Sequence, residues 1–112
     1  MSGPVIEVKD ERSERAYIVY VDGAPAGRAE YLMRDGRVVF VHTEIDDEHK
    51  GLGLARKLVR YALDDVRSKG ELLVPICPFV SAYIQRHPEY DDLVDHDLSM
   101  QFKRRRGTSD VD

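Results

Sequence analysis

Hydrophobic side chains in the first half of the chain follow the two-residue period of β-strands. Residues 16–21 are apolar, β-branched and aromatic, a composition typical of a buried strand. Residues 26–33 form a weaker strand pattern, residues 38–45 the clearest one, and residues 5–8 a short one at the start. Asp-Gly pairs stand between the later strands, where a tight turn needs a residue that adopts positive φ. The pattern therefore predicts a sheet built from consecutive hairpins.

The alternation within residues 38–45 predicts which side chains share a face of the sheet. One face is expected to carry Val38, Phe40, His42 and Glu44, and the other Val39, Val41, Thr43 and Ile45. Both sets begin with apolar residues, so this strand is expected at the centre of the sheet.

After residue 50 the hydrophobic period becomes that of an α-helix. The apolar positions run from Leu52 to Val66, and we expect a helix over 51–69 that ends at a glycine. A short apolar strand follows at 71–76. Because one helix connects it to the strand at 38–45, the two strands are expected to be nearly parallel. A second helix is expected from Pro78, a residue favoured at the first helical position, to the His87-Pro88 pair.

Length and composition fit one globular domain with a single core. The chain has 112 residues, of which 34% are charged and 42% hydrophobic. We expect the domain to span residues 1–96 and a flexible tail to follow at 97–112. No apolar run approaches the roughly 20 residues that a membrane helix needs, which argues against a membrane partner.

Charge and cysteine content narrow the class of protein further. The net charge of −4 argues against a general nucleic-acid binder, which is usually basic. The basic run at 103–106 is interpreted as part of the solvated tail. The single cysteine, Cys77, excludes an internal disulfide, and the N-terminal segment lacks the apolar stretch of a signal peptide. Both features predict a cytoplasmic protein.

Two glycines, Gly51 and Gly53, stand between the strongest strand and the strongest helix. N–H groups at a helix start have no helical partner, and the helix dipole adds positive potential there. Such a turn suits a phosphate or pyrophosphate, although a tight turn can need glycine for its backbone alone. A Walker motif is excluded because no Lys-Ser/Thr pair follows. Arg56 at the third glycine position disfavours a dinucleotide fingerprint.

The order of these elements resembles the GNAT superfamily of N-acetyltransferases, and most closely its small, single-domain members. The superfamily pattern Gln/Arg-x-x-Gly-x-Gly/Ala aligns with residues 48–53. Further matching segments are residues 41–44, 49–55, 75–80, 83–84 and 87–90. The resemblance implies an α/β fold of the α+β type, with a mostly antiparallel sheet of about five strands and two main helices. It also implies acetyl-coenzyme A as co-substrate and no metal.

In the superfamily, backbone amides of the glycine turn hold the pyrophosphate of coenzyme A, and an open strand edge holds its pantetheine arm. Carried over, this implies a binding set of Thr43, Glu44, Ile45, His49, Lys50, Gly51, Leu52, Gly53, Leu54, Ala55, Arg56, Cys77, Phe79 and Tyr83. Glu48 departs from the usual Gln or Arg, and the acids at 44 and 46–48 repel a pyrophosphate. We therefore expect modest affinity for coenzyme A, with Lys50 and Arg56 offsetting the ligand's charge.

Four residues are candidates for catalysis. Cys77 directly precedes Pro78 and is expected to be the N-cap of the second helix, where the dipole favours a thiolate. It would act as a nucleophile or only line the thioester pocket. Tyr83 approximately matches the superfamily's proton donor to the departing coenzyme A. His42 and Glu44 are candidate bases for an attacking ammonium. Packing or solvated positions remain the alternative for each of the four.

The sequence thus predicts transfer of acetyl from acetyl-coenzyme A to an amine. Few residues remain beyond the cofactor scaffold, so an open site for a protein lysine, an N-terminus or a polyamine is expected. A monomer or weak dimer is expected too. Two alternatives stay open: a non-catalytic coenzyme A or acyl-coenzyme A binding module, and a GNAT-like interaction domain without a ligand.

Overall fold

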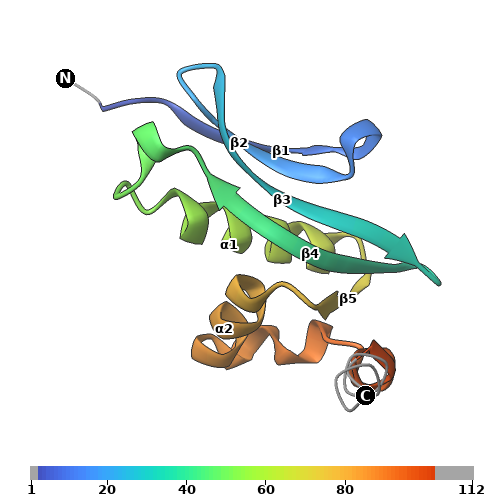
Figure 1. Ribbon diagram of the computed structural model, residues 1–112. Helices are drawn as coiled ribbons and strands as arrows, with labels where there is room; N and C mark the ends of the chain where they lie inside the picture. Colours follow the sequence, from blue (N-terminus) through green and yellow to red (C-terminus); the bar gives the residue numbers. More distant parts are fainter. Residues whose placement is uncertain (1–2, 103–112) are drawn as a thin grey trace, which may run out of the picture.

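Five strands form one sheet in sequence order (Figure 1). The computed structural model describes residues 3–102. The first four strands pair antiparallel and the last pair is parallel. The strands are β1 (Ile6–Glu11), β2 (Ala16–Val21), β3 (Ala24–Arg34), β4 (Arg37–Ile45) and β5 (Leu72–Pro75). The mostly antiparallel sheet and the parallel final pair predicted from the sequence are confirmed.

Two helices cover one face of the sheet. They are α1 (Leu54–Ser68) and α2 (Pro78–Arg86). The apolar stripe of α1 and the inner residues of α2 join one core with alternate side chains of β2, β3 and β4. Three short 3₁₀ segments, Arg12–Glu14, Asp47–His49 and Pro88–Leu93, complete the connections.

The other face of the sheet is covered only in part. Residues 96–102 are helical, and Leu98 packs there against Val39 and Val74, with Phe102 beside them. Six residues that the sequence pattern assigned to a tail, 97–102, therefore belong to this packed segment. The basic run at 103–106 and the rest of the expected tail lie outside the described residues.

A partly buried polar network fixes the end of α1 against the sheet. The Tyr17 hydroxyl donates to Asp65 at 2.8 Å, and the Tyr31 hydroxyl donates to Asp10 at 2.7 Å. The Lys69 ammonium lies 2.9 Å from Asp10 and 2.7 Å from Asp65. Burial and these bonds raise the pKa of both tyrosines. The network thereby holds α1 in a defined position, which also sets the direction of its opposite end.

Candidate functional site

Strands β4 and β5 diverge halfway along β4. Their pairing covers Arg37 to Phe40, and the Cys77 N–H then donates to the Phe40 carbonyl at 2.8 Å. Beyond that point the chain after β5 turns into α2, while β4 continues to Ile45 paired only with β3. Among residues 3–102, no strand therefore pairs with residues 41–45 of β4 on the side opposite β3.

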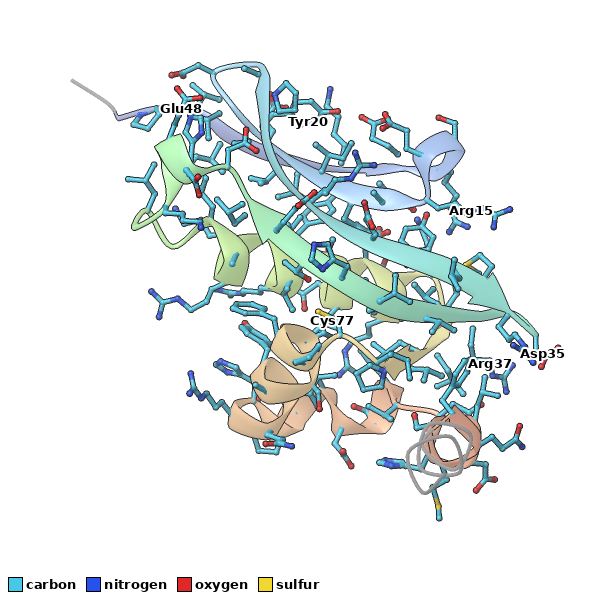
Figure 2. All side chains as sticks on the ribbon, in the orientation of Figure 1. Arg15, Tyr20, Asp35, Arg37, Glu48 and Cys77 are labelled. Atoms are coloured by element: carbon cyan, nitrogen blue, oxygen red, sulfur yellow. The ribbon has the colours of Figure 1, made fainter. Side chains whose placement is uncertain are left out.

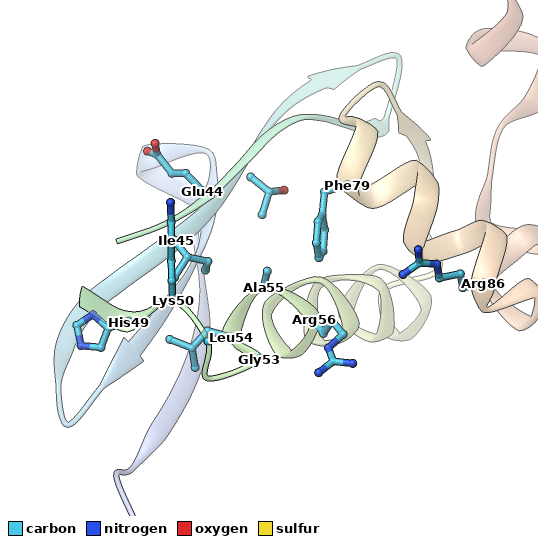
Figure 3. A pocket seen from close by; sticks show the side chains of 12 residues that line it. Glu44, Ile45, His49, Lys50, Gly53, Leu54, Ala55, Arg56, Phe79 and Arg86 are labelled. Carbon is cyan, nitrogen blue, oxygen red and sulfur yellow. The ribbon is translucent and has the colours of Figure 1, made fainter. Parts of the chain in front are cut away.

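A groove of about 640 Å³ follows this open edge (Figure 3). The end of β4, the turn before α1, the first turn of α1 and the face of α2 that carries Phe79 and Arg86 form its walls. Its lining is Thr43, Glu44, Ile45, His49, Lys50, Gly51, Gly53, Leu54, Ala55, Arg56, Phe79 and Arg86. All of these except Arg86 belong to the binding set implied by the sequence resemblance. The other three members of that set, Leu52, Cys77 and Tyr83, do not line the groove.

The glycine turn lies at one end of the groove, and α1 starts later than predicted. Gly51 and Gly53 have φ of +90° and +72°, a left-handed conformation that a right-handed helix cannot include. The helix therefore begins at Leu54 instead of residue 51. The first helical bond runs from the Lys57 N–H to the Gly53 carbonyl. The N–H groups of residues 54–56 therefore have no helical acceptor.

Three cationic side chains line the groove, together with the carboxylate of Glu44. Figure 3 shows Arg56 on α1 and Arg86 on α2, and neither forms an ion pair within the described part of the chain. The Lys50 ammonium instead lies 2.9 Å from Asp47. This contact raises the pKa of Lys50 and lowers that of Asp47. Of the predicted pair of phosphate partners, Arg56 is thus available and Lys50 already has a carboxylate partner.

Glu48, the departure from the superfamily pattern, is exposed and does not line the groove. Figure 2 shows it on the segment that precedes the glycine turn. His49 lines the groove, and its Nδ1 atom is buried without a partner among residues 3–102. Buried polar atoms in native proteins usually have a partner. An acceptor in the groove would supply it.

A bulge in β4 changes which side chains face the groove. Glu30 pairs with His42 and Tyr31 with Phe40, so Val41 has no partner in β3. Strand faces alternate with every residue, and one extra residue exchanges them. The predicted face sets are therefore wrong beyond the bulge. Thr43 and Ile45 share the helix-covered face with Phe40, whereas His42 and Glu44 lie on the other face.

His42 and Glu44 share a face of β4, as predicted, and lie close together. The His42 Nε2 atom is 3.5 Å from Glu44 Oε2, and both side chains are 57% exposed. Glu44 also borders a second, smaller cavity of about 360 Å³ on the face away from the helices. Glu44 consequently borders both cavities, and His42 lies next to it on the same face of β4.

Cys77 is the N-cap of α2 with Pro78 at the first helical position, as expected. Figure 2 shows it between the sheet and α2. Its side chain is buried, with 2% exposure. The sulfur lies 3.3 Å from the Thr43 hydroxyl, which does line the groove. The thiol is therefore next to the groove and separated from it by Thr43.

Tyr83 is a core residue. It is 9% exposed, and its ring stacks on His87 with ring centres 4.2 Å apart. Burial raises the pKa of its phenol. Arg86, one turn further along α2, is the groove residue that sequence reasoning missed. Its helical spacing from Phe79 puts both residues on one side of α2, but the sequence did not show that this side borders the groove.

Residues 3–102 contain no group of three or more His, Cys, Asp or Glu side chains arranged to hold a metal ion. The same residues contain no helix long and apolar enough to cross a membrane.

A family model described as GCN5-related N-acetyl-transferase matches residues 16–93. Among solved structures, the chain is similar to a ribosomal-protein-alanine N-acetyltransferase from Brucella melitensis biovar Abortus 2308, with 22% identity and a TM-score of 0.46. That match covers 70% of this chain and 60% of the other. No curated protein matches the sequence.

Proposed function

The chain belongs to the GCN5-related N-acetyltransferase family, and on that premise we propose that it transfers acetyl from acetyl-coenzyme A to an amine. The observation that carries the proposal is the groove, which joins a glycine turn with free N–H groups to an open strand edge. The first feature suits a pyrophosphate and the second suits an extended amide-containing arm. One ligand with both parts is coenzyme A.

The residues present fit the anionic end of this ligand. Gly51 and Gly53 leave the backbone accessible, and the N–H groups of residues 54–56 have no helical acceptor. Arg56 and Arg86 bring two cations to the same groove. The orphaned Nδ1 of His49 gains a partner if it carries the proton and meets a phosphate oxygen. Glu48 is exposed and does not line the groove, whereas Glu44, another of the four acids before the glycine turn, does line it.

The reacting end would lie where β4 and β5 part, near Thr43 and Phe79. Acetyl-coenzyme A supplies an activated acetyl thioester there. An incoming ammonium must lose a proton before its nitrogen attacks. Glu44 borders both cavities and His42 is its neighbour, so either side chain accepts this proton, directly or through water. The amine then reaches the thioester from the face opposite the helices.

That opposite face favours a cationic acceptor. Its cavity is lined by Glu14, Glu44 and Asp46, with Arg28 as the one cation among them. Glu30 lies beside Arg28 on the same face. Carboxylates attract a protonated amine and steer it toward the edge of β4. A lysine or N-terminus of a basic polypeptide is the acceptor we propose, in the cytoplasm, with a polyamine as the smaller alternative.

Calorimetric titration of acetyl-coenzyme A into the protein tests the binding step. We expect saturable binding, which Gly53→Asp abolishes because it places a carboxylate among the phosphate-binding amides. Gly53→Asn is the matched neutral variant and should weaken binding far less, since asparagine tolerates positive φ. Gly36→Asp adds the same strain at φ +76° in a hairpin remote from the groove. The affinity of the Gly36→Asp variant for acetyl-coenzyme A should equal that of the wild type.

Transfer is tested with a synthetic peptide in which one lysine is flanked by arginines, and its acetylation is followed by mass spectrometry. Acetylation that requires the intact glycine turn supports the proposal. Binding without transfer to this peptide, to a free N-terminal amine or to spermidine would indicate a non-catalytic binding module. Absence of binding, with no thermal stabilisation by ligand, would indicate an interaction domain that lacks the ligand.

A further inference from the structure

Thr43 and Cys77 form a contact that links the groove to the buried core. The Thr43 Oγ1 atom is 3.3 Å from Cys77 Sγ, although 33 residues separate them in the sequence. The bulge at Val41 turns Thr43 toward this side of the sheet, and the N-cap position of α2 turns Cys77 toward Thr43. Two independent local features therefore converge on one hydrogen bond.

Access distinguishes the two partners. Thr43 lines the groove, whereas Cys77 is 2% exposed and does not. A sulfur nucleophile must reach the thioester carbon along a defined line of attack. Here the Thr43 side chain stands between the sulfur and the groove. The geometry suits a thiol that acts on Thr43 better than a thiol that attacks the substrate.

Either partner of this contact can be the donor. The Thr43 hydroxyl both donates and accepts hydrogen bonds, and the Cys77 thiol does both more weakly. When the Cys77 thiol donates to the Thr43 oxygen, the Thr43 proton is left free to point elsewhere. Since Thr43 lines the groove, that proton can point into it.

We propose that the Thr43 hydroxyl donates a hydrogen bond to the reacting thioester, and that Cys77 is a positioning residue that orients this hydroxyl. The inference rests on the proposed function of the groove. In the transfer step, a bond forms between the amine nitrogen and the acetyl carbon, and the carbon–sulfur bond of the thioester breaks. The proton of the amine goes to the base and coenzyme A leaves as the thiolate. No bond forms to Cys77, and Thr43 keeps its proton while stabilising the developing negative charge.

Matched variants separate this assignment from nucleophilic catalysis. Thr43→Val keeps the shape and removes the hydroxyl, and Thr43→Ser keeps the hydroxyl and removes the methyl group. Thr43→Val should lower kcat for the lysine peptide about tenfold or more, as expected for the loss of one hydrogen bond to developing charge. KM for acetyl-coenzyme A should change little, and Thr43→Ser should restore most of the rate.

Cysteine variants complete the test. Cys77→Ala should lower kcat less than Thr43→Val does, and Cys77→Ser should recover most of that loss because it restores a donor. The double variant Thr43→Val/Cys77→Ala should match Thr43→Val alone, since Cys77 acts only through Thr43. Intact-mass spectrometry of the wild type with acetyl-coenzyme A and no acceptor should find no acetyl group on Cys77.

An acetylated Cys77 that transfers its acetyl group to the peptide, or complete loss of transfer in Cys77→Ala, would overturn the proposal. Equal kcat in wild type and Thr43→Val would overturn it too. Thermal unfolding and calorimetric affinity for acetyl-coenzyme A, measured on every variant, show whether the groove is intact. A wild type that fails to bind or transfer contradicts the proposed function itself, and is thereby distinguished from a failure of the Thr43 assignment.

Discussion

Gly27 faces the end of β4 with no room for a side chain. A Cβ atom at this position would meet the Ile45 side chain and would lie 2.7 Å from the Glu44 carbonyl. The groove wall therefore depends on the close approach of β3 to β4 at this point.

We expect Gly27→Ala to destabilise the fold by about 1–3 kcal/mol, because overpacking forces the backbone of β4 to move. It should also weaken acetyl-coenzyme A binding, since Ile45 lines the groove. Urea unfolding and calorimetry measure the two effects. Gly3→Ala, where a Cβ would meet nothing within 4 Å, is the control. Equal stability of Gly27→Ala and wild type would contradict the close approach.

Rules of local backbone conformation were sufficient to place several residues of the site from the sequence. The glycine turn and the N-cap position of Cys77 follow from backbone requirements that glycine and proline show directly in the sequence. Tyr83 and Leu52 could not be placed in this way. Whether a helical side chain faces a groove, the core or solvent depends on how the helix is rotated against the sheet, which packing alone determines.

Asp95 connects two elements on the partly covered face of the sheet. Its carboxylate accepts the Leu98 N–H at 3.0 Å, as the N-cap of the helical segment 96–102, and lies 2.8 Å from Arg37 Nε on β4. The Leu98 bond and then Arg37 lower the pKa of this carboxyl below its usual value of 3.8. A lowered pKa in the folded state means that the ionised form stabilises the fold.

This contribution is present above pH 3.8 and is lost as the pH falls through the lower pKa of the folded state. Asp95→Asn should therefore lower Tm at pH 7, by about 4 °C if one such interaction is lost. The difference in Tm between wild type and variant should shrink below pH 3.8. Asp97→Asn, at an exposed neighbouring position, should show no comparable difference. Thermal scans by circular dichroism across this pH range are the measurement, and a pH-independent difference would contradict the assignment.

At the scale of elements, the sequence predicted which strands and helices exist better than where they begin. Strand and helix periods identified the sheet, both helices and the parallel final pair. The start of α1 was misplaced because apolar spacing continues through Leu52, whereas positive φ at the glycines prevents helix there. The bulge at Val41 was missed because a single extra residue leaves no compositional trace in an apolar strand.

At the scale of the whole molecule, positive and negative charges are separated in part between two cavities. Lys50, Arg56 and Arg86 line the groove together with Glu44, and Glu14, Glu44 and Asp46 line the cavity on the opposite face together with Arg28. A net charge of −4 conceals this separation, because the composition sums over residues that the fold places on different faces. Only the strand order and the register of β3 against β4 bring the acidic side chains together.

Glu30→Gln should raise KM for the arginine-flanked lysine peptide several-fold, because it removes one charge from the acidic face without touching the groove. Affinity for acetyl-coenzyme A should not change. The loss should diminish at high salt, where charges at the surface are screened. Glu89→Gln, an exposed acid on the segment after α2, is the matched control. An unchanged KM in Glu30→Gln would show that the acidic face takes no part in acceptor binding.

Val41, which has no partner in β3, shifts the alternation of side chains between the two faces of β4. Every position before it keeps its assignment, and every position after it is shifted by one. Deleting Val41 would make the pairing of β3 with β4 regular and leave Thr43 on the side of Cys77. If Val41 instead paired with β3 like its neighbours, Thr43 would turn away from Cys77, and His42 and Glu44 would face the groove. In this fold, then, one residue without a partner decides which side chains of the second half of β4 face the groove.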